Sequence, residues 1–237
     1  IMNIFEQISF SLSDKIIVES ENIIEFAKLR KYKHKISKNY ASPEFIDVDL
    51  FRIRKCSKNK MILVGYIGRL SEEKGVMNFV KSIPIVTKNK KDVEFLVGGS
   101  GPLLNEIEKE LKNNGSYLKT HLTNWIPHDQ IPNYLNELKL LIIPSFTEGL
   151  PGLLREAMSC GTPVLATPVG SIPDLIKDGV SGFIMENNTP ECIAENIARV
   201  LERSDLDKIA ANARKIIENE YTYKATIEKY KKILNEF

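Results

Sequence analysis

Residues 144–173 read PSFTEGLPGLLREAMSCGTPVLATPVGSIP, and this stretch carries the densest signal in the chain. The apolar run LLIIP at 140–144 predicts a strand that ends at Pro144. A loop with two glycines and a proline, EGLPG at 148–152, then leads into a helix predicted over 153–160. We therefore expect a strand, a loop and a helix in succession, with the loop at the carboxyl end of a parallel strand, where α/β sheets bind their ligands.

Apolar runs alternate with helical patterns from residue 61 onward. Strands are predicted at 61–68, 93–98, 121–125, 140–144, 163–166 and 182–185. Apolar residues at helical spacing predict helices at 76–88, 103–111, 131–138, 153–160, 191–203, 206–219 and 223–234. Strands that are apolar on both faces and separated by helices indicate βαβ units. The fold class predicted is α/β, with a doubly wound parallel sheet.

The first 60 residues follow a different pattern. KIIVE at 15–19 predicts one strand between two helical stretches, and such a strand cannot satisfy its backbone groups alone. We expect it to be the end of another sheet. Residues 1–38 are thus predicted to be the remnant of a second α/β domain, and 39–60 to be an interdomain linker. The complete domain then covers 61–220, and a final helix covers 221–237.

Composition excludes several classes of protein. Of 237 residues 43% are hydrophobic and 27% charged, and the net charge is only +2, so no global field favours nucleic acid as a partner. The three cysteines are widely spaced, with neither a disulfide framework nor a zinc site indicated. No apolar run approaches the length of a membrane span, and the start is not a secretory signal. We expect a soluble cytoplasmic protein.

Charged residues surround the predicted strand ends. Glu148 and Glu156 bracket the start of the helix at 153–160, where free backbone N–H groups suit a phosphate. Gly149 and Gly152 permit close approach of the backbone to a ligand. GRLSEEKG at 68–75 ends the first strand and supplies Arg and Lys, which can hold phosphate oxygens. The two carboxylates suit hydroxyl groups on either side of a diphosphate, which is the layout of a nucleotide-sugar.

These motifs resemble the donor domain of glycosyltransferase family 4, whose fold is the two-Rossmann GT-B type. GRLSEEKG, GGSGP at 98–102, the stretch from 144 and VGSIPDLI at 169–176 carry the resemblance, with Ser171 in place of one usual glycine. The two glutamates separated by seven residues are its hallmark. Residues 14–18 resemble the last strand of the family's N-terminal acceptor domain, and 223–234 resemble the helix that crosses back to that domain.

The resemblance assigns a role to each candidate site residue. Arg69 and Lys74 would hold the donor diphosphate and stabilise the leaving group, while Glu148 would contact the donor sugar and Glu156 the ribose. The backbone of Ile126, in TNWIP at 123–127, would touch the base. The remaining substrate-binding residues would be those of the glycine-bearing loops, Gly68, Gly149, Leu150, Pro151, Gly152 and Leu153.

Other features are interpreted as structural. The D-x-D at Asp47 and Asp49 lies in the predicted linker, so we assign it no metal. His128 follows a turn proline and is expected to cap the helix at 131–138, while Tyr117, Trp125 and Tyr134 are expected to pack rather than to stack on a ligand. The basic run at 28–38 is interpreted as solvated, with peripheral contact at the inner face of a membrane as the alternative.

The resemblance implies a retaining hexosyltransferase that needs neither a metal nor a cofactor. Its donor would be a UDP- or GDP-sugar and its acceptor a glycan or a lipid-linked molecule, as in polysaccharide biosynthesis. The alternatives are a nucleotide-sugar epimerase of related fold and a non-catalytic nucleotide-sugar-binding fragment. We expect this chain alone to bind the donor without transferring the sugar, because the acceptor half lies outside it.

Overall fold

The structure is a computed structural model that describes residues 4–54 and 62–236. Its centre is a parallel sheet of six strands in the order β3-β2-β1-β4-β5-β6. The strands are β1 Ile62–Ile67, β2 Val93–Gly98, β3 Thr120–Thr123, β4 Leu140–Ile143, β5 Val164–Ala166 and β6 Phe183–Ile184. The prediction of a doubly wound α/β fold is confirmed, since this strand order is the one that doubly wound sheets adopt.

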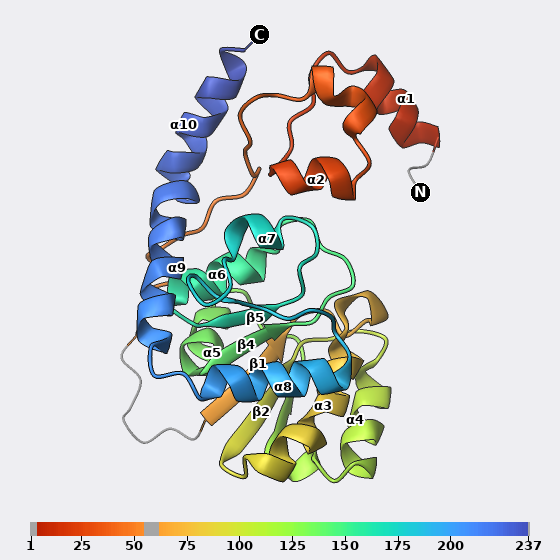
Figure 1. Ribbon diagram of the computed structural model, residues 1–237, viewed down its shortest axis with the longest axis vertical. Helices are drawn as coiled ribbons and strands as arrows, with labels where there is room; N and C mark the ends of the chain where they lie inside the picture. Colours follow the sequence, from red (N-terminus) through yellow and green to blue (C-terminus); the bar gives the residue numbers. More distant parts are fainter. Residues whose placement is uncertain (1–3, 55–61, 237) are drawn as a thin grey trace.

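Helices cover both faces of this sheet (Figure 1). The helices of residues 62–236 are α3 Val76–Asn89, α4 Leu104–Asn113, α5 Ile131–Glu137, α6 Gly152–Cys160, α7 Ile172–Leu175, α8 Pro190–Leu201, α9 Leu206–Glu220 and α10 Tyr223–Leu234. One face packs on α3, α4 and α8, and the other on α5, α6 and α9. Because both faces are covered, strands such as β4 are buried along their whole length, which explains their unbroken apolar sequence.

The sheet reverses its winding between β1 and β4, which lie side by side in register at Val64↔Leu140. The chain moves outward from β1 to β2 and β3, then returns to β4 and continues to β5 and β6 on the other side. Connections from the two central strands therefore diverge and leave a crevice at their carboxyl ends. The loops of GRLSEEKG and EGLPG both start at this crevice.

The N-terminal region consists of α1 Ile4–Leu12, α2 Glu21–Phe26 and a 3-10 helix η1 Arg30–Lys35. The predicted strand at 15–19 is wrong: this segment makes only an isolated parallel bridge, Ile16↔Ile36. Its apolar side chains pack instead into a small cluster with Ile24, Leu29 and Tyr32. An extended apolar segment becomes a strand only when a neighbouring edge pairs with it, and the described residues offer it a single residue pair.

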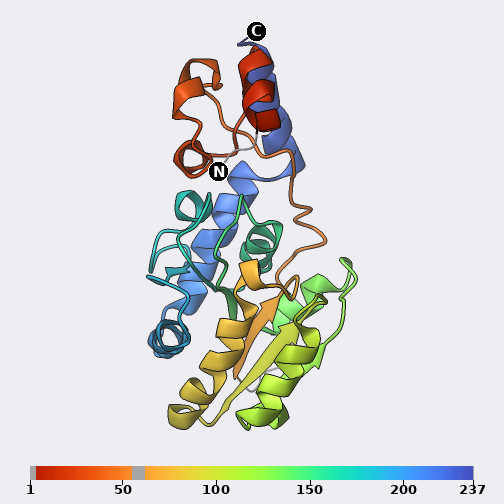
Figure 2. The same cartoon turned by 90° about the vertical axis from the view of Figure 1, so that its right-hand side faces the viewer.

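The last helix runs beside the N-terminal region, as Figures 1 and 2 both show. The Glu236 carboxylate, just beyond α10, accepts hydrogen bonds from Ser37 Oγ at 2.9 Å and from Asn39 Nδ2 at 2.6 Å. At the other end of α10, the rings of Tyr223 and Phe45 meet edge to face with centroids 5.2 Å apart. The crossover role of this helix and the domain boundaries stay predictions.

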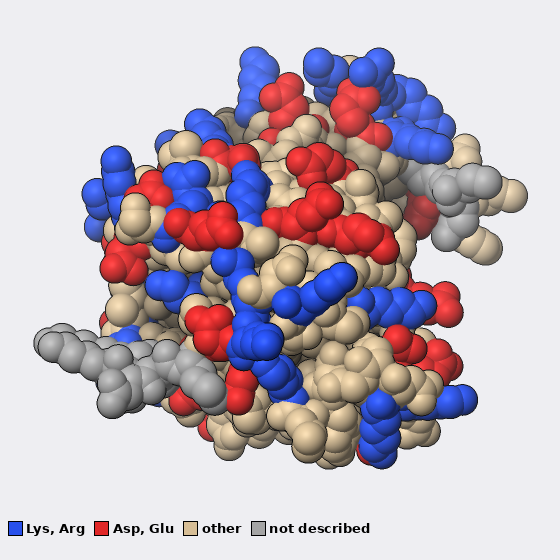
Figure 3. All heavy atoms as spheres, turned by 60° about the horizontal axis from the view of Figure 1, so that its bottom comes forward, with Lys and Arg blue, Asp and Glu red and all other residues tan. Residues whose placement is uncertain are grey.

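Charges are mixed over the surface. Lys and Arg alternate with Asp and Glu on the face drawn in Figure 3, as expected for a chain with a net charge of +2. Most lysines of the segment 28–38 are exposed, whereas Tyr32 and Ile36 are buried. Membrane contact by this segment stays a prediction. Within the part of the chain that the structure describes, every helix is too short or too polar to cross a bilayer.

Candidate functional site

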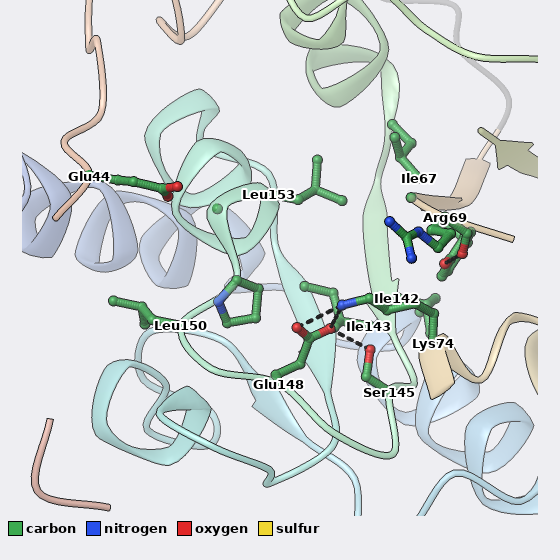
Figure 4. A pocket seen from close by; sticks show the side chains of 14 residues that line it. Glu44, Ile67, Arg69, Lys74, Ile142, Ile143, Ser145, Glu148, Leu150 and Leu153 are labelled. Carbon is green, nitrogen blue, oxygen red and sulfur yellow. Dashed lines mark hydrogen bonds and ion pairs between the residues drawn. The ribbon is translucent and has the colours of Figure 1, made fainter. Parts of the chain in front are cut away.

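A cavity of about 400 Å³ opens at the carboxyl ends of β1 and β4 (Figure 4). The sequence-predicted residues that line it are Gly68, Arg69, Lys74, Glu148, Leu150, Pro151, Gly152 and Leu153. Gly149 instead lines an adjoining hollow, which Arg69, Lys74 and Glu148 also border. The structure therefore brings the two basic residues and the EGLPG loop together at the sheet's switch point.

Lys74 and Glu148 form the polar centre of this cavity. The Lys74 ammonium lies 2.8 and 2.9 Å from the two carboxylate oxygens of Glu148, and Ser145 Oγ donates to Oε1 at 2.6 Å. The Glu148 side chain is only 9% exposed, compared with 32% for Lys74. A buried carboxylate with two donors is fixed in place, and Figure 4 shows the Lys74 ammonium turned toward it.

The backbone sets this contact. Lys74 ends the short 3-10 helix η2 Glu72–Lys74, and Gly75 follows with a left-handed φ of 67°. A Cβ on Gly75 would collide with the Pro144 carbonyl, so only glycine lets the η2 turn lie directly against the end of β4. Phe146 N donates to Glu73 O at 2.9 Å, which joins the loop after β4 to η2.

The segment after β5 packs against the EGLPG loop and is hydrogen-bonded to it. Ser171 N donates to Gly149 O at 2.9 Å, and Gly170 before it has a φ of 58°. A Cβ on Gly170 would collide with the carbonyls of Glu148 and Gly149. The loop leads into α6, whose N-terminus receives no side-chain cap from the residues that the structure describes. Its first backbone N–H groups are therefore free to meet a ligand beside Gly152 and Leu153, which line the cavity.

Arg69 stands on the β1 side of the cavity. It is exposed, and within residues 4–54 and 62–236 its guanidinium makes no hydrogen bond. Its carbonyl accepts a hydrogen bond from the Tyr66 hydroxyl at 2.6 Å. Burial, with the nearby Glu148 and Glu73 carboxylates, raises the pKa of Tyr66 well above its usual range. Tyr66 is therefore a neutral donor that fixes the Arg69 backbone, while the guanidinium is left to bind an anion.

A second cavity of about 390 Å³ adjoins the first through Gly68 and Arg69. Ile126 lines it, as the sequence suggested, together with Gly99, Ser100 and Trp125. The expectation that Trp125 packs is wrong, because its side chain is 69% exposed while the neighbouring Ile126 is 7% exposed. Of these two neighbours, Ile126 is the one that joins the core beside the second cavity.

Glu156 lies apart from these linings and has a specific partner. His128 Nε2 is 2.7 Å from Glu156 Oε1. The expected capping role of His128 is wrong, since Gln130 precedes α5 and no side chain among the described residues caps that helix. Sequence spacing could not reveal the pair, because the two residues are 28 positions apart and join a turn to a separate helix.

Arg155 is a buried group that the sequence analysis missed. Its side chain is fully buried on α6, and Nη2 lies 2.7 Å from Glu44 Oε2 in the segment predicted to be the linker. Nη1 donates to Ser42 Oγ at 3.0 Å and to Glu44 O at 3.1 Å. Burial raises the pKa of Glu19, against the effect of Arg155 and of a hydrogen bond from the Leu150 backbone. The EGLPG loop thus contacts Glu19 of the segment after α1, and Arg155 of α6 contacts Ser42 and Glu44.

Comparison with known proteins identifies the chain's family. Residues 48–223, well over half of the chain, match the family described as "Glycosyl transferases group 1". The chain belongs to this family. The sheet and its helices correspond to one Rossmann-like half of the GT-B fold.

Curated relatives include an alpha-D-kanosaminyltransferase of Streptomyces kanamyceticus, 29% identical over 69% of this chain and 42% of the relative. The capsular polysaccharide biosynthesis glycosyltransferase CapM of Staphylococcus aureus is 25% identical over 92% of this chain and 54% of CapM. The chain spans about half the length of these two relatives.

Solved structures show the same fold. Anabaena Alr3699/HepE in complex with UDP superimposes with a TM-score of 0.82 at 18% identity, covering 98% of this chain and 66% of that one. The C-terminal domain of the LpcC group 1 glycosyl transferase from Francisella tularensis gives 0.67 at 23% identity, covering 75% of this chain and 99% of that domain.

Proposed function

We propose that this chain is the donor-binding part of a retaining glycosyltransferase, which transfers a hexosyl group from a UDP- or GDP-sugar to a glycan or lipid-linked acceptor. The observation that supports this best is the cavity at the β1/β4 switch point. There Arg69 and Lys74 stand beside the uncapped start of α6. The family and the UDP complex of the HepE structure are in keeping with a nucleotide-sugar donor.

Arg69 and Lys74 are proposed to bind the two phosphates. A guanidinium can hold phosphate oxygens in pairs, and an ammonium adds a mobile point charge. When the glycosidic bond to the donor breaks, negative charge grows on the departing diphosphate. Cationic groups fixed beside it lower the barrier, because they need not reorganise as the charge develops. This is the reason for proposing a reaction that does not depend on a catalytic metal. The proposed retention of configuration is a separate reason, and it leads us to propose that the acceptor attacks from the leaving-group side.

Glu148 is proposed to accept hydrogen bonds from the donor sugar's hydroxyls, and Glu156 from the ribose. The contact of Glu148 with Lys74 sharpens this assignment. When the Lys74 ammonium turns toward a phosphate, Glu148 loses one donor and can accept another from a sugar hydroxyl. Glu148→Ala should therefore weaken binding of the nucleotide-sugar more than binding of the free nucleoside diphosphate.

Product analysis tests the proposed reaction. The full-length gene product and this 237-residue chain are incubated with UDP- and GDP-sugars and candidate acceptors. We expect the full-length protein to form a glycoside whose anomeric configuration matches the donor, and the short chain to form none. An inverted product, an epimerised donor or efficient transfer by the short chain would each refute a part of the proposal.

A further inference from the structure

His128 and Glu156 belong to two segments whose neighbouring residues line the two cavities. Glu156 follows Gly152 and Leu153 by four and three positions on α6, so the three share one helix face, and the first two line the first cavity. His128 lies in the turn between Ile126 and Ile131, which both line the second cavity. The hydrogen bond between them therefore connects the walls of the two cavities.

The linker fixes the imidazole in this position. The ring of Phe51 lies 5.2 Å from the His128 ring, between centroids, and Phe51 is 2% exposed. Ser159 Oγ donates to the Phe51 carbonyl at 2.7 Å, so α6 also holds Phe51 in place. The imidazole thus has a packed side and a polar contact, although 65% of its side chain is exposed. It is more constrained than an isolated surface ion pair.

The chemistry of the contact gives each partner one role. An ionised carboxylate only accepts hydrogen bonds, so His128 Nε2 must carry the hydrogen. Glu156 is 12% exposed, and within the described residues its second oxygen, Oε2, makes no hydrogen bond. The donor from His128 fixes the plane of the carboxylate and leaves lone pairs on both oxygens. Two neighbouring hydroxyl groups, such as those of a ribose, can fill them.

We propose that His128 is a positioning residue, which holds the Glu156 carboxylate ready for the ribose hydroxyls and thereby favours ribonucleotides over 2′-deoxyribonucleotides. This inference rests on the proposed function, which assigns Glu156 to the ribose. His128 acts through Glu156 and need not touch the nucleotide. Its removal should therefore weaken recognition of the 2′-hydroxyl while it leaves diphosphate binding by Arg69 and Lys74 intact.

The test compares UDP and GDP with their 2′-deoxy counterparts by titration calorimetry. Wild type should prefer the ribonucleotide, and His128→Ala should lose roughly threefold to tenfold in ribonucleotide affinity, the effect of one hydrogen bond. Its affinity for the 2′-deoxynucleotide should fall less, because that nucleotide offers Glu156 one hydroxyl group instead of two. His128→Gln should restore part of the preference, because its amide can donate. The double variant H128A/E156A should bind no more weakly than Glu156→Ala.

The chain offers a matched control in His121, whose Nε2 lies 2.8 Å from Glu94 Oε2 on an exposed part of the sheet. His121→Ala should change neither affinity. An equal loss of ribo- and deoxynucleotide binding in His128→Ala, with its melting temperature unchanged, would overturn the positioning role. So would an unaltered preference in that variant. If wild type bound neither UDP nor GDP, the proposed function would fail first, and this inference with it.

Discussion

The two ends of this chain bury their apolar residues in different ways. Residues 62–236 contain a six-stranded sheet with an extensive core on each face. The N-terminal region has one β-bridge and a small cluster, and α1 leaves Ile4, Phe5, Ile8 and Leu12 exposed. The sheet region thus has what an independent domain requires. The N-terminal region, in contrast, exposes apolar side chains that need another surface to cover them.

The N-terminal region is joined to the sheet region by a few polar contacts. Ser20 Oγ donates to Ser171 Oγ at 2.7 Å in a buried contact, and Asn22 Nδ2 donates to Asp174 Oδ1 at 2.6 Å. Both partners belong to the segment after β5 that supports the EGLPG loop. The departure from glycine at Ser171 therefore has a structural use, which is to hold the N-terminal region beside the proposed donor site.

The largest loss of unfolding free energy should come from a substitution in the sheet. Leu141→Ala in β4 removes a fully buried side chain and should cost about 2–5 kcal/mol of unfolding free energy. Phe5→Ser in α1, where the side chain is 82% exposed, should change stability by less than about 0.5 kcal/mol. Denaturant titrations followed by circular dichroism measure both. Equal losses would show that the two regions do not differ as described.

Ligand binding should depend on the crevice. Arg69→Ala and Lys74→Ala should each weaken nucleoside diphosphate binding by about 1.5–3 kcal/mol, because each removes a charge-assisted hydrogen bond. Lys90→Ala is the control. The Lys90 ammonium lies 3.1 Å from a Glu202 carboxylate oxygen, and neither residue lines the two cavities. Calorimetric titration measures all three. Unchanged affinity in Arg69→Ala and Lys74→Ala would place the site elsewhere.

The junction with the linker should have a smaller effect on stability. Glu44→Gln removes the carboxylate beside the buried Arg155 guanidinium, which keeps the Ser42 hydroxyl and the Glu44 carbonyl as acceptors. We expect a loss of about 1–2 kcal/mol. Glu218→Gln, at the i,i+4 pair with Arg214, should lose less than about 0.5 kcal/mol. If thermal melts gave the two variants the same shift, Arg155 would not anchor the linker.

The smallest effect concerns pH. Because burial raises the pKa of Glu19 in the folded chain, its ionisation favours the unfolded state. The stability that the protonated Glu19 carboxyl gives the fold is complete below the ordinary glutamate pKa, and it is lost as pH rises through the raised pKa. Glu19→Gln should thus be more stable than wild type at pH 7, and the difference should shrink on acidification. A difference that grew toward low pH would have the wrong sign.

The same contrast explains how far the sequence could be interpreted. The strand at 93–98 and the helix at 223–234 were predicted to the residue, because their apolar patterns agree with buried surroundings on one or both faces. KIIVE at 15–19 has a similar pattern but no sheet edge beside it, so the prediction of a strand was wrong. The local pattern of apolar residues indicates which side chains are buried. It does not report whether a pairing partner is present.

The site shows the same limit. Glycines and charges at strand ends predicted the cavity at β1 and β4, since the carboxyl ends of parallel strands meet at one edge. The partners of these residues come from distant segments: Lys74 contacts Glu148, His128 contacts Glu156, and Glu44 contacts Arg155. Such contacts depend on how loops fold back over the sheet, and neither spacing nor composition records that.

Fluorescence of Trp125 tests the central claim most directly, because it is the chain's one tryptophan and lines the cavity next to Arg69. The 237-residue chain is titrated with UDP and GDP, with and without EDTA, while tryptophan emission and binding heat are recorded. We predict saturable binding of at least one nucleotide, a matching change in emission, and no loss in chelator. Binding that left Trp125 emission unchanged, or that disappeared in EDTA, would contradict the account.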